Sequence, residues 1–269
     1  MKRSFEGKVS EFDPSVYWAN HNTQPSVIAY RAREDSRQKQ ASNRVYNTYE
    51  GHKSARQLSE TVPEFLARLP PYSSHITDCG PWIFISNPSY DPNKTREDIR
   101  LYKVEGAQLL STFQDQQTAL QDPTKQTRKL NALRKQLQDD IFSLAKQSKL
   151  TAGKWMLFRA PADINRIWAL VATAVASGEL GHAAKVASDD GSGDSKSRLI
   201  CIYSEDFSDR EDVKRVLLAL RRMGLVTGDR GIYYKTDAFT WLEINGGNQW
   251  GLKASLYASK DVLKESWGT

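Results

Sequence analysis

The sequence contains few cysteines and shows no metal-binding pattern built on them. Its 269 residues include only Cys79 and Cys201. Two cysteines cannot form the disulfide framework that staples small secreted domains, and neither lies in a metal-ligand spacing. Cys201 falls within the apolar run 199–203, which predicts a small buried side chain. The expected compartment is therefore a reducing one, the cytoplasm or alternatively the nucleus.

Long apolar runs are also absent. No segment approaches the roughly 20 apolar residues that a membrane-spanning helix needs. The first six residues carry charges with no apolar stretch after them, which does not fit a secretory signal peptide. The sequence therefore predicts no membrane partner. Its hydrophobic fraction of 39% still suffices for a folded core.

Catalytic patterns are missing as well. The four histidines are scattered, and none lies in a nucleophile or metal motif: His21, His52, His75 and His182. Four carboxylates could form a metal or acid–base cluster, but such residues more often cap helices or pair with Arg210 or Lys235. These four are Glu205, Asp206, Asp209 and Asp237. We expect no catalytic residue, no metal site and no cofactor, with an undetected phosphoesterase-type enzyme as an alternative.

The positive charge is concentrated in one segment. The net charge is +6, and residues 123–150 carry seven lysines and arginines against two aspartates, which is +5. Apolar residues recur every three or four positions from Leu130 to Leu144, which predicts a basic amphipathic helix at about 124–149. A solvated charged face explains Arg128, Lys135 and Lys146 better than a nucleic-acid contact does.

Composition divides the chain into three parts. Residues 1–60 are polar and predict an N-terminal arm, residues 61–259 predict a single domain, and residues 260–269 predict a C-terminal tail. Within the domain, apolar runs predict strands at 81–86, 154–158, 183–188, 199–203, 232–235, 239–244 and 252–258. Residues 246–248 predict a hairpin turn between the last two strands.

Amphipathic patterns between these runs predict the helices. They are expected at 59–69 with Thr61 as its cap, at 95–113, at about 163–177 with Asp163 as its cap, and after Asp209. Strands and helices alternate irregularly. This order predicts an α+β fold with a largely antiparallel sheet and helices on one face. Three tryptophans, Trp82, Trp168 and Trp241, are expected mainly in the core.

Several segments carry a family resemblance. They are 153–155, 184–186, 200–210 and 234–240, together with Trp250, Tyr257 and the earlier 70–71 and 82–83. These residues resemble the eukaryotic family named after a basophilic-leukaemia-expressed protein, over about 63–259. The resemblance implies a fold similar to the messenger-RNA cap-binding translation initiation factor, with a curved antiparallel sheet backed by helices. The resemblance implies no activity for this chain. The two tryptophans that bind the base in the cap-binding factor do not align with any pair of tryptophans in this sequence.

A binding site is predicted from cations and large aromatics beside the expected strands. If these side chains alternate onto one concave sheet face, the rings could stack bases while the cations hold phosphates. The candidate ligand-binding residues are Lys154, Trp155, Lys185, Arg210, Lys235 and Trp250. The competing interpretation places both tryptophans in the core and pairs the cations with the acidic residues.

Two interpretations of function follow. The first is a non-catalytic domain that binds RNA or a nucleotide on the concave sheet face. The second is a protein-interaction or regulatory module without a nucleic-acid ligand, whose partner contacts the N-terminal arm or the helix from Leu130 to Leu144.

Overall fold

The strands form one six-stranded sheet in the order β1-β3-β4-β2-β5-β6, and every neighbouring pair is antiparallel. They span β1 (Trp82–Ser86), β2 (Gly153–Arg159), β3 (Ala183–Ala187), β4 (Arg198–Ser204), β5 (Tyr233–Thr236) and β6 (Tyr257–Ala258). The computed structural model describes residues 44–94, 97–120, 127–193, 196–227, 231–264 and 267.

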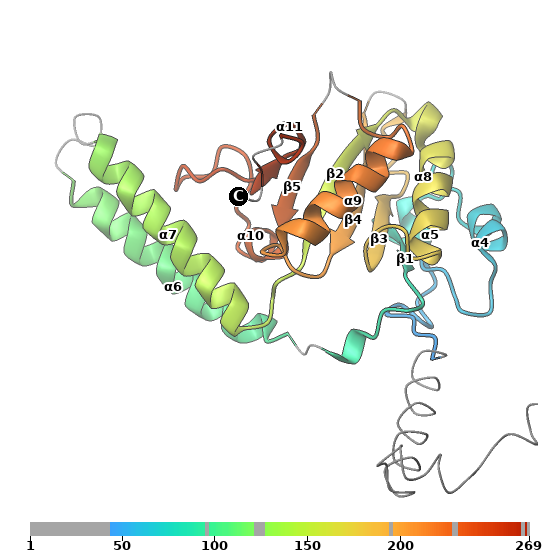
Figure 1. Ribbon diagram of the computed structural model, residues 1–269, viewed down its shortest axis with the longest axis horizontal. Helices are drawn as coiled ribbons and strands as arrows, with labels where there is room; N and C mark the ends of the chain where they lie inside the picture. Colours follow the sequence, from blue (N-terminus) through green and yellow to red (C-terminus); the bar gives the residue numbers. More distant parts are fainter. Residues whose placement is uncertain are drawn as a thin grey trace, which may run out of the picture. The chain divides into compact units, whose positions relative to one another are not determined.

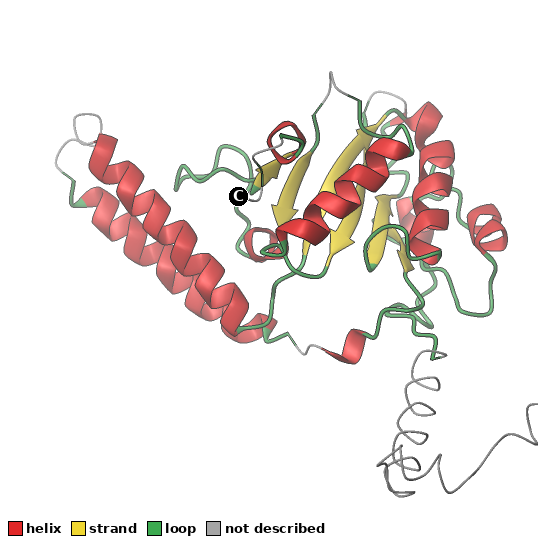
Figure 2. Ribbon diagram, in the orientation of Figure 1, coloured by secondary structure: helices red, strands yellow, loops and turns green. Residues whose placement is uncertain are grey.

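The other regular elements of the described chain are helices. They are α4 (Val62–Arg68), α5 (Ile76–Cys79), the 3₁₀ turn η1 (Pro92–Lys94), α6 (Ile99–Thr118), α7 (Thr127–Gln147), α8 (Pro161–Ala176), α9 (Arg210–Arg222), α10 (Asp237–Trp241) and α11 (Ser259–Val262). Two of them, α8 and α9, lie against one face of the sheet (Figures 1 and 2). The α+β class and the antiparallel sheet with helices on one face are thus confirmed.

Strand alternation explains this arrangement. Successive side chains of a strand point to opposite faces, so every second residue shares a face. Ile83, Leu157, Ile200 and Ile202 are fully buried on the face that α8 and α9 cover. On α8, Trp168 is fully buried in the same core. Burying such apolar side chains contributes about 1.5–3 kcal/mol each, which fixes the helices on this side.

The opposite face, here called the open face, consists of three rows of side chains set by the strand register. The first row contains Ser86, Ala183, Tyr203, Lys154 and Lys235. The second row contains Phe84, Lys185, Cys201, Met156 and Tyr233. The third row contains Trp82, Ala187, Leu199 and Phe158. The charged members of these rows are all lysines.

Helix ends follow local chemistry. Thr61 caps α4 in a capping box with Glu64, and Asp209 caps α9 by accepting a hydrogen bond from the Asp212 amide, as expected. Asp163 does not cap α8, because the cap position is Ala160 and Pro161 already begins the helix. Asp163 instead lies in the first turn, where its charge still suits the helix dipole.

The C-terminal third departs from the expected strands. Residues 237–241 form the helix α10, capped by the Thr236 side chain, where a strand was expected at 239–244. Of the expected strand 252–258, only residues 257–258 pair with β5. The expected hairpin turn at 246–248 therefore joins no two strands. β3 and β4, which are consecutive strands along the chain, pair antiparallel. Trp241 is 38% exposed at the end of α10 rather than in the core, and Trp82 is on the open face, whereas Trp168 is buried as expected.

The compact unit extends from Val45 to Thr269. It therefore includes residues 45–60, which composition had assigned to the arm. Ala55 is fully buried and pairs with Phe84, beside β1. The expected tail is also partly integrated, since Val262 is fully buried in α11. The rest of the arm lies outside the described residues, apart from Arg44.

Helices α6 and α7 lie side by side as a hairpin (Figure 1). The stripe on α7 packs inward as expected, with Leu130, Leu137, Ile141 and Leu144 buried. Arg128, Lys135 and Lys146 are exposed on the other side of the helix, so the basic segment forms a solvated face. Among the described residues, no helix combines the length and apolarity needed to cross a membrane.

Candidate functional site

A hollow of about 560 Å³ lies over the open face. Its floor includes Phe84, Lys185 and Tyr203 from neighbouring strands. Two stretches outside the sheet form its walls. One contributes Thr48 and Tyr49 before β1, and the other follows β1 and contributes residues between Tyr90 and Ile99. The hollow is thus built from parts of the chain that are distant in sequence.

Among the described residues that line this hollow, Lys185 is the one lysine or arginine. Its ammonium lies 4.2 Å from the centroid of the Trp82 ring and 5.8 Å from that of Tyr203. Within the described part of the chain it forms no hydrogen bond and no salt bridge. Burial lowers the pKa of Lys185 below its ordinary value, and the neighbouring Lys154 charge lowers it further. A partly desolvated ammonium in contact with aromatic rings is suited to holding an anion.

The other two lysines of the open face are already engaged. Lys154 is 5% exposed, pairs with the Asp237 carboxylate and donates to Thr240 Oγ1 at 2.8 Å. Lys235 is 9% exposed and donates to Asn245 Oδ1 at 2.7 Å. The prediction that these lysines share one face with Lys185 is therefore correct, but their ammonium groups are used within the protein.

Two carboxylates line the same hollow. Asp237 begins α10 and holds Lys154, while Glu97 belongs to the segment that leads into α6. Burial raises the pKa of Glu97, and repulsion from Asp237 raises it further. Carboxylate oxygens at these positions can accept hydrogen bonds from a ligand that carries N–H groups.

Aromatic rings provide most of the remaining surface. Tyr49 packs against Phe84 with ring centroids 4.8 Å apart, and Tyr90 packs against His182 at 4.6 Å. Burial is the main cause that raises the pKa of Tyr49 to about 12, so the hydroxyl stays protonated at neutral pH. These rings present faces and edges against which a planar ligand can stack.

Three of the six predicted ligand-binding residues lie elsewhere. Trp155 is fully buried on the helix-covered face, where its indole donates to the Val213 carbonyl of α9 at 3.0 Å. Arg210 begins α9, and its guanidinium lies 5.3 Å from the Trp267 ring. Trp250 packs partly buried beside α7, and its carbonyl accepts from Arg134. The strand period explains the burial of Trp155. It directly follows Lys154 on β2, and successive side chains of a strand point to opposite faces of the sheet.

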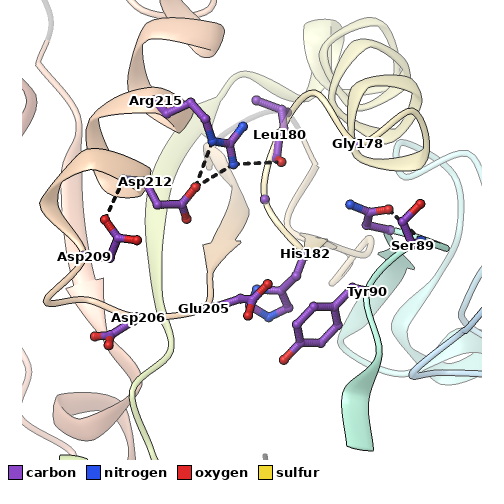
Figure 3. A pocket seen from close by; sticks show the side chains of 12 residues that line it. Ser89, Tyr90, Gly178, Leu180, His182, Glu205, Asp206, Asp209, Asp212 and Arg215 are labelled. Atoms are coloured by element: carbon purple, nitrogen blue, oxygen red, sulfur yellow. Dashed lines mark hydrogen bonds and ion pairs between the residues drawn. The ribbon is translucent and has the colours of Figure 1, made fainter. Parts of the chain in front are cut away.

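A second hollow of about 430 Å³ shares Tyr90 and His182 with the first. Figure 3 shows its acidic side, where Asp209 and Asp212 belong to the N-terminus of α9. Arg215 pairs with Asp212 and also donates to the carbonyls of Glu179 and Leu180. The acidic side is therefore largely tied into the helix and its neighbouring loop.

The four predicted carboxylates do not form one cluster. Asp237 lies in the first hollow, whereas Glu205, Asp206 and Asp209 line the second. Asp209 caps α9, and Asp206 accepts from the Ser208 amide and hydroxyl. Asp237 pairs with Lys154 rather than Lys235. In the parts of the chain that the structure describes, no group of three or more His, Cys, Asp or Glu is arranged to hold a metal ion.

The histidines are separated as the sequence indicated. His52 lies edge-on to Phe84, and His75 caps α5 by accepting from the Thr77 amide. His182 lies between the two hollows, and its Nδ1 is buried without a hydrogen-bond partner within the described residues. Burial lowers the pKa of His182 to about 4, so its ring is neutral at pH 7. His21 lies outside the described residues.

Sequence reasoning missed most of the hollow's aromatic lining. Phe84 and Tyr203 carry a detectable signal, because both sit at alternate positions of predicted strands and share a face with Lys185. The sequence gives no such signal for Tyr49, Tyr90 and Glu97, because they lie in irregular segments whose path depends on tertiary packing. The buried thiol of Cys201 was predicted correctly, with 1% of its surface exposed.

The fold therefore defines an α+β protein with an open antiparallel sheet, helices on one face and a hollow on the other. The chain belongs to the family of the basophilic leukemia-expressed protein Bles03, whose model matches residues 5–243. This match confirms the family resemblance. The match includes most of the segment assigned to the arm, which the resemblance at 63–259 did not, and it ends before Trp250 and Tyr257.

Proposed function

We propose that this protein is a non-catalytic domain that binds an RNA end or a nucleotide in the hollow over the open face. The observation that carries the proposal is the position of Lys185. Its ammonium faces a hollow lined by aromatic rings, and no carboxylate among the described residues pairs with it. Keeping a partly buried cation unpaired costs stability, which an anionic ligand would offset.

Each part of a nucleotide has a matching group in the hollow. A phosphate would bind Lys185, as charge-assisted contacts to phosphate are among the strongest hydrogen bonds. The base would stack on the tyrosine and phenylalanine rings, which contributes about 1–3 kcal/mol per base. Glu97 and Asp237 would accept from N–H groups at the edge of the base. Together these contacts support binding in the micromolar range.

The implied likeness to the cap-binding initiation factor guides the choice of ligand. A capped RNA end combines a cationic methylated base with a phosphate chain. Both acidic and aromatic groups are available in the hollow for such a base, and Lys185 is available for the phosphates. We therefore include a capped dinucleotide among the ligands to be tested, beside guanosine and uridine nucleotides.

A fluorescence titration tests this function directly. The Trp82 indole contacts the Lys185 ammonium, so a phosphate bound there should change its emission. Binding should weaken with salt, with a log–log slope of about one for each phosphate contact. Lys185→Met should lower the affinity for nucleotide roughly tenfold or more.

Lys253→Met is the matched control, because Lys253 is an exposed lysine that does not line the hollow. It removes the same charge and should leave the affinity unchanged. If none of the nucleotides binds at low salt, or if both variants behave alike, the proposal is wrong.

The protein-interaction alternative is favoured by one different feature. A groove of about 410 Å³ runs between α6 and α7 and is lined by Leu109 and Leu144 among polar residues. A helical partner segment is the kind of ligand that such a groove accommodates. A protein captured through this groove would survive nuclease treatment, whereas an RNA-mediated contact would be lost. No specific observation favours the phosphoesterase alternative.

A further inference from the structure

Two exposed aromatic rings lie on the open face beside the hollow. Phe158 of β2 is 56% exposed and Tyr233 of β5 is 54% exposed. Met156 lies directly opposite Tyr233 in the register, and Phe158 is two residues further along the same strand. The two rings are therefore diagonal neighbours, a separation that aromatic side chains can bridge.

Tyr233 continues the row that contains Lys185, and Phe158 lies in the neighbouring row. Lys185, Cys201, Met156 and Tyr233 form one row across four strands. Three strand spacings separate Lys185 from Tyr233, which is about 14 Å. One nucleotide held at Lys185 does not span this distance, but a chain of several nucleotides does.

Lys185 supplies a positive charge on this surface that can contact a phosphate of a nucleic acid. Of the three lysines at strand positions of the open face, Lys154 is paired with Asp237 and Lys235 donates to Asn245, whereas Lys185 has no carboxylate partner among the described residues. Large apolar rings exposed on a sheet next to cations are the arrangement by which sheets bind single-stranded RNA.

From this continuity we infer that the ligand is a single-stranded oligonucleotide rather than an isolated nucleotide. Its terminal nucleotide occupies the hollow at Lys185, and a following base stacks on the platform made by Phe158 and Tyr233. This inference rests on the proposed function and adds the ligand's length and direction across β4, β2 and β5. Because stacking tolerates any base, the platform contributes affinity with little sequence preference.

The experiment compares uridine monophosphate with a 5′-phosphorylated tetrauridylate by fluorescence anisotropy and titration. Uridine strands form little structure of their own, so the difference reports on the protein. The tetranucleotide should bind roughly tenfold tighter or more, the gain expected from one added stacked base. An abasic tetranucleotide with the same phosphates should lose most of this gain, because it lacks the bases.

Substitutions then assign the gain to the two rings. Phe158→Val and Tyr233→Val keep β-branched residues suited to strands and should bring the tetranucleotide close to the monophosphate. Phe158→Tyr and Tyr233→Phe retain a ring and should retain the gain. Tyr72→Val is the matched control, since Tyr72 is 45% exposed but lies outside the sheet.

The outcomes separate this inference from the proposed function. If the monophosphate binds and depends on Lys185 but the tetranucleotide binds no tighter, the platform is refuted and the hollow stands. If neither ligand binds, the proposed function itself has failed. If the valine variants instead change the sedimentation of the protein without changing tetranucleotide affinity, the rings form a contact between copies, and the inference is overturned.

Discussion

Lys154 of β2 is paired with Asp237, the first residue of α10, and the same ammonium donates to Thr240 Oγ1. This pair closes one side of the hollow and joins α10 to the sheet. It also explains why one lysine of the open face is structural while Lys185 remains available. The two side chains are only 7% and 20% exposed, so neither partner can be solvated well if the other is removed.

Removing one partner of this pair should cost much more than removing both. Lys154→Met and Asp237→Asn are each expected to lower the free energy of unfolding by about 3 kcal/mol, because a buried charge is left uncompensated. The double variant Lys154→Met with Asp237→Asn should recover most of the loss. Urea unfolding of the four proteins measures the coupling.

The exposed pair of Asp163 and Arg166 provides the control. Its side chains are 55% and 67% exposed, so Asp163→Asn should change stability by less than about 1 kcal/mol. Single variants at Lys154 or Asp237 that cost no more than this control would contradict a structural role for the buried pair.

Lys185→Met should stabilise the protein at pH 7 while it weakens ligand binding. The lowered pKa of Lys185 means that the folded chain binds this proton less strongly than the unfolded chain does. The free energy of unfolding therefore rises with pH between the lowered pKa and about 10.5, the ordinary value. Thermal unfolding at pH 7 and pH 10.5 should show this rise in the natural protein and less of it in the variant.

The same lysine sets the pH dependence of binding. As the pH is raised, affinity for nucleotide should begin to fall before pH 10.5 is reached. The lowered pKa of Lys185 means that its ammonium loses the proton at a lower pH than an ordinary lysine does. Lys185→Arg keeps its charge throughout this range and should bind with a flatter profile. A wild-type profile that matches the arginine variant up to pH 10.5 would show that Lys185 does not hold the ligand.

His182 should make the protein sensitive to acid. Its pKa is lowered to about 4 mainly by burial, although Asp237 and Asp212 oppose this effect. Between pH 6.5 and pH 4, His182 is protonated in the unfolded chain but stays neutral in the folded chain. The free energy of unfolding therefore decreases as the pH falls. The loss should reach about 3 kcal/mol. His182→Phe keeps a ring beside Tyr90 and should flatten this part of the profile.

Urea unfolding at pH 7.0, 5.5 and 4.5 measures the effect of His182. His52→Phe is the matched control, because His52 is exposed. An equal flattening in both variants would assign the acid sensitivity to histidines in general rather than to the buried ring between the hollows.

Gly181→Ala should disrupt the start of β3. A Cβ atom at Gly181 would lie 1.6 Å from the Tyr203 carbonyl oxygen, so backbone must move to admit it. We expect a loss of about 3 kcal/mol and weaker ligand binding, because His182 and Tyr203 both line the hollow. Gly246→Ala, where a Cβ meets nothing within 4 Å, should leave both unchanged. Equal midpoints in urea for the two variants would contradict this close approach.

Trp155→Phe should lower the stability of the protein without lowering its affinity for nucleotide. The substitution removes the indole hydrogen bond to the Val213 carbonyl and leaves part of a buried volume empty. A loss of about 2 kcal/mol in urea unfolding is expected, with nucleotide affinity unchanged at low temperature. A selective loss of affinity without a loss of stability would return Trp155 to the binding site.

Much of the fold could be predicted because it depends on local patterns. The first five strands lie within a residue or two of their expected positions, since unbroken or alternating apolar runs specify buried strands. Strand period also placed Lys154, Lys185 and Lys235 on one face. The segment 237–241 was missed, because its aromatic residues favour a strand while the Thr236 cap and the fit against α7 favour a helix.

The sequence by itself determined the secondary structure around the sheet, the class of the fold and the family, because periodicity and local motifs are encoded within short segments. Only the tertiary structure decided which lysine is available, since a carboxylate far away in sequence pairs with Lys154 and none of the described ones pairs with Lys185. It likewise decided the hollow, whose walls come from irregular segments before β1 and before α6. Such walls depend on contacts between distant residues, which no local pattern records.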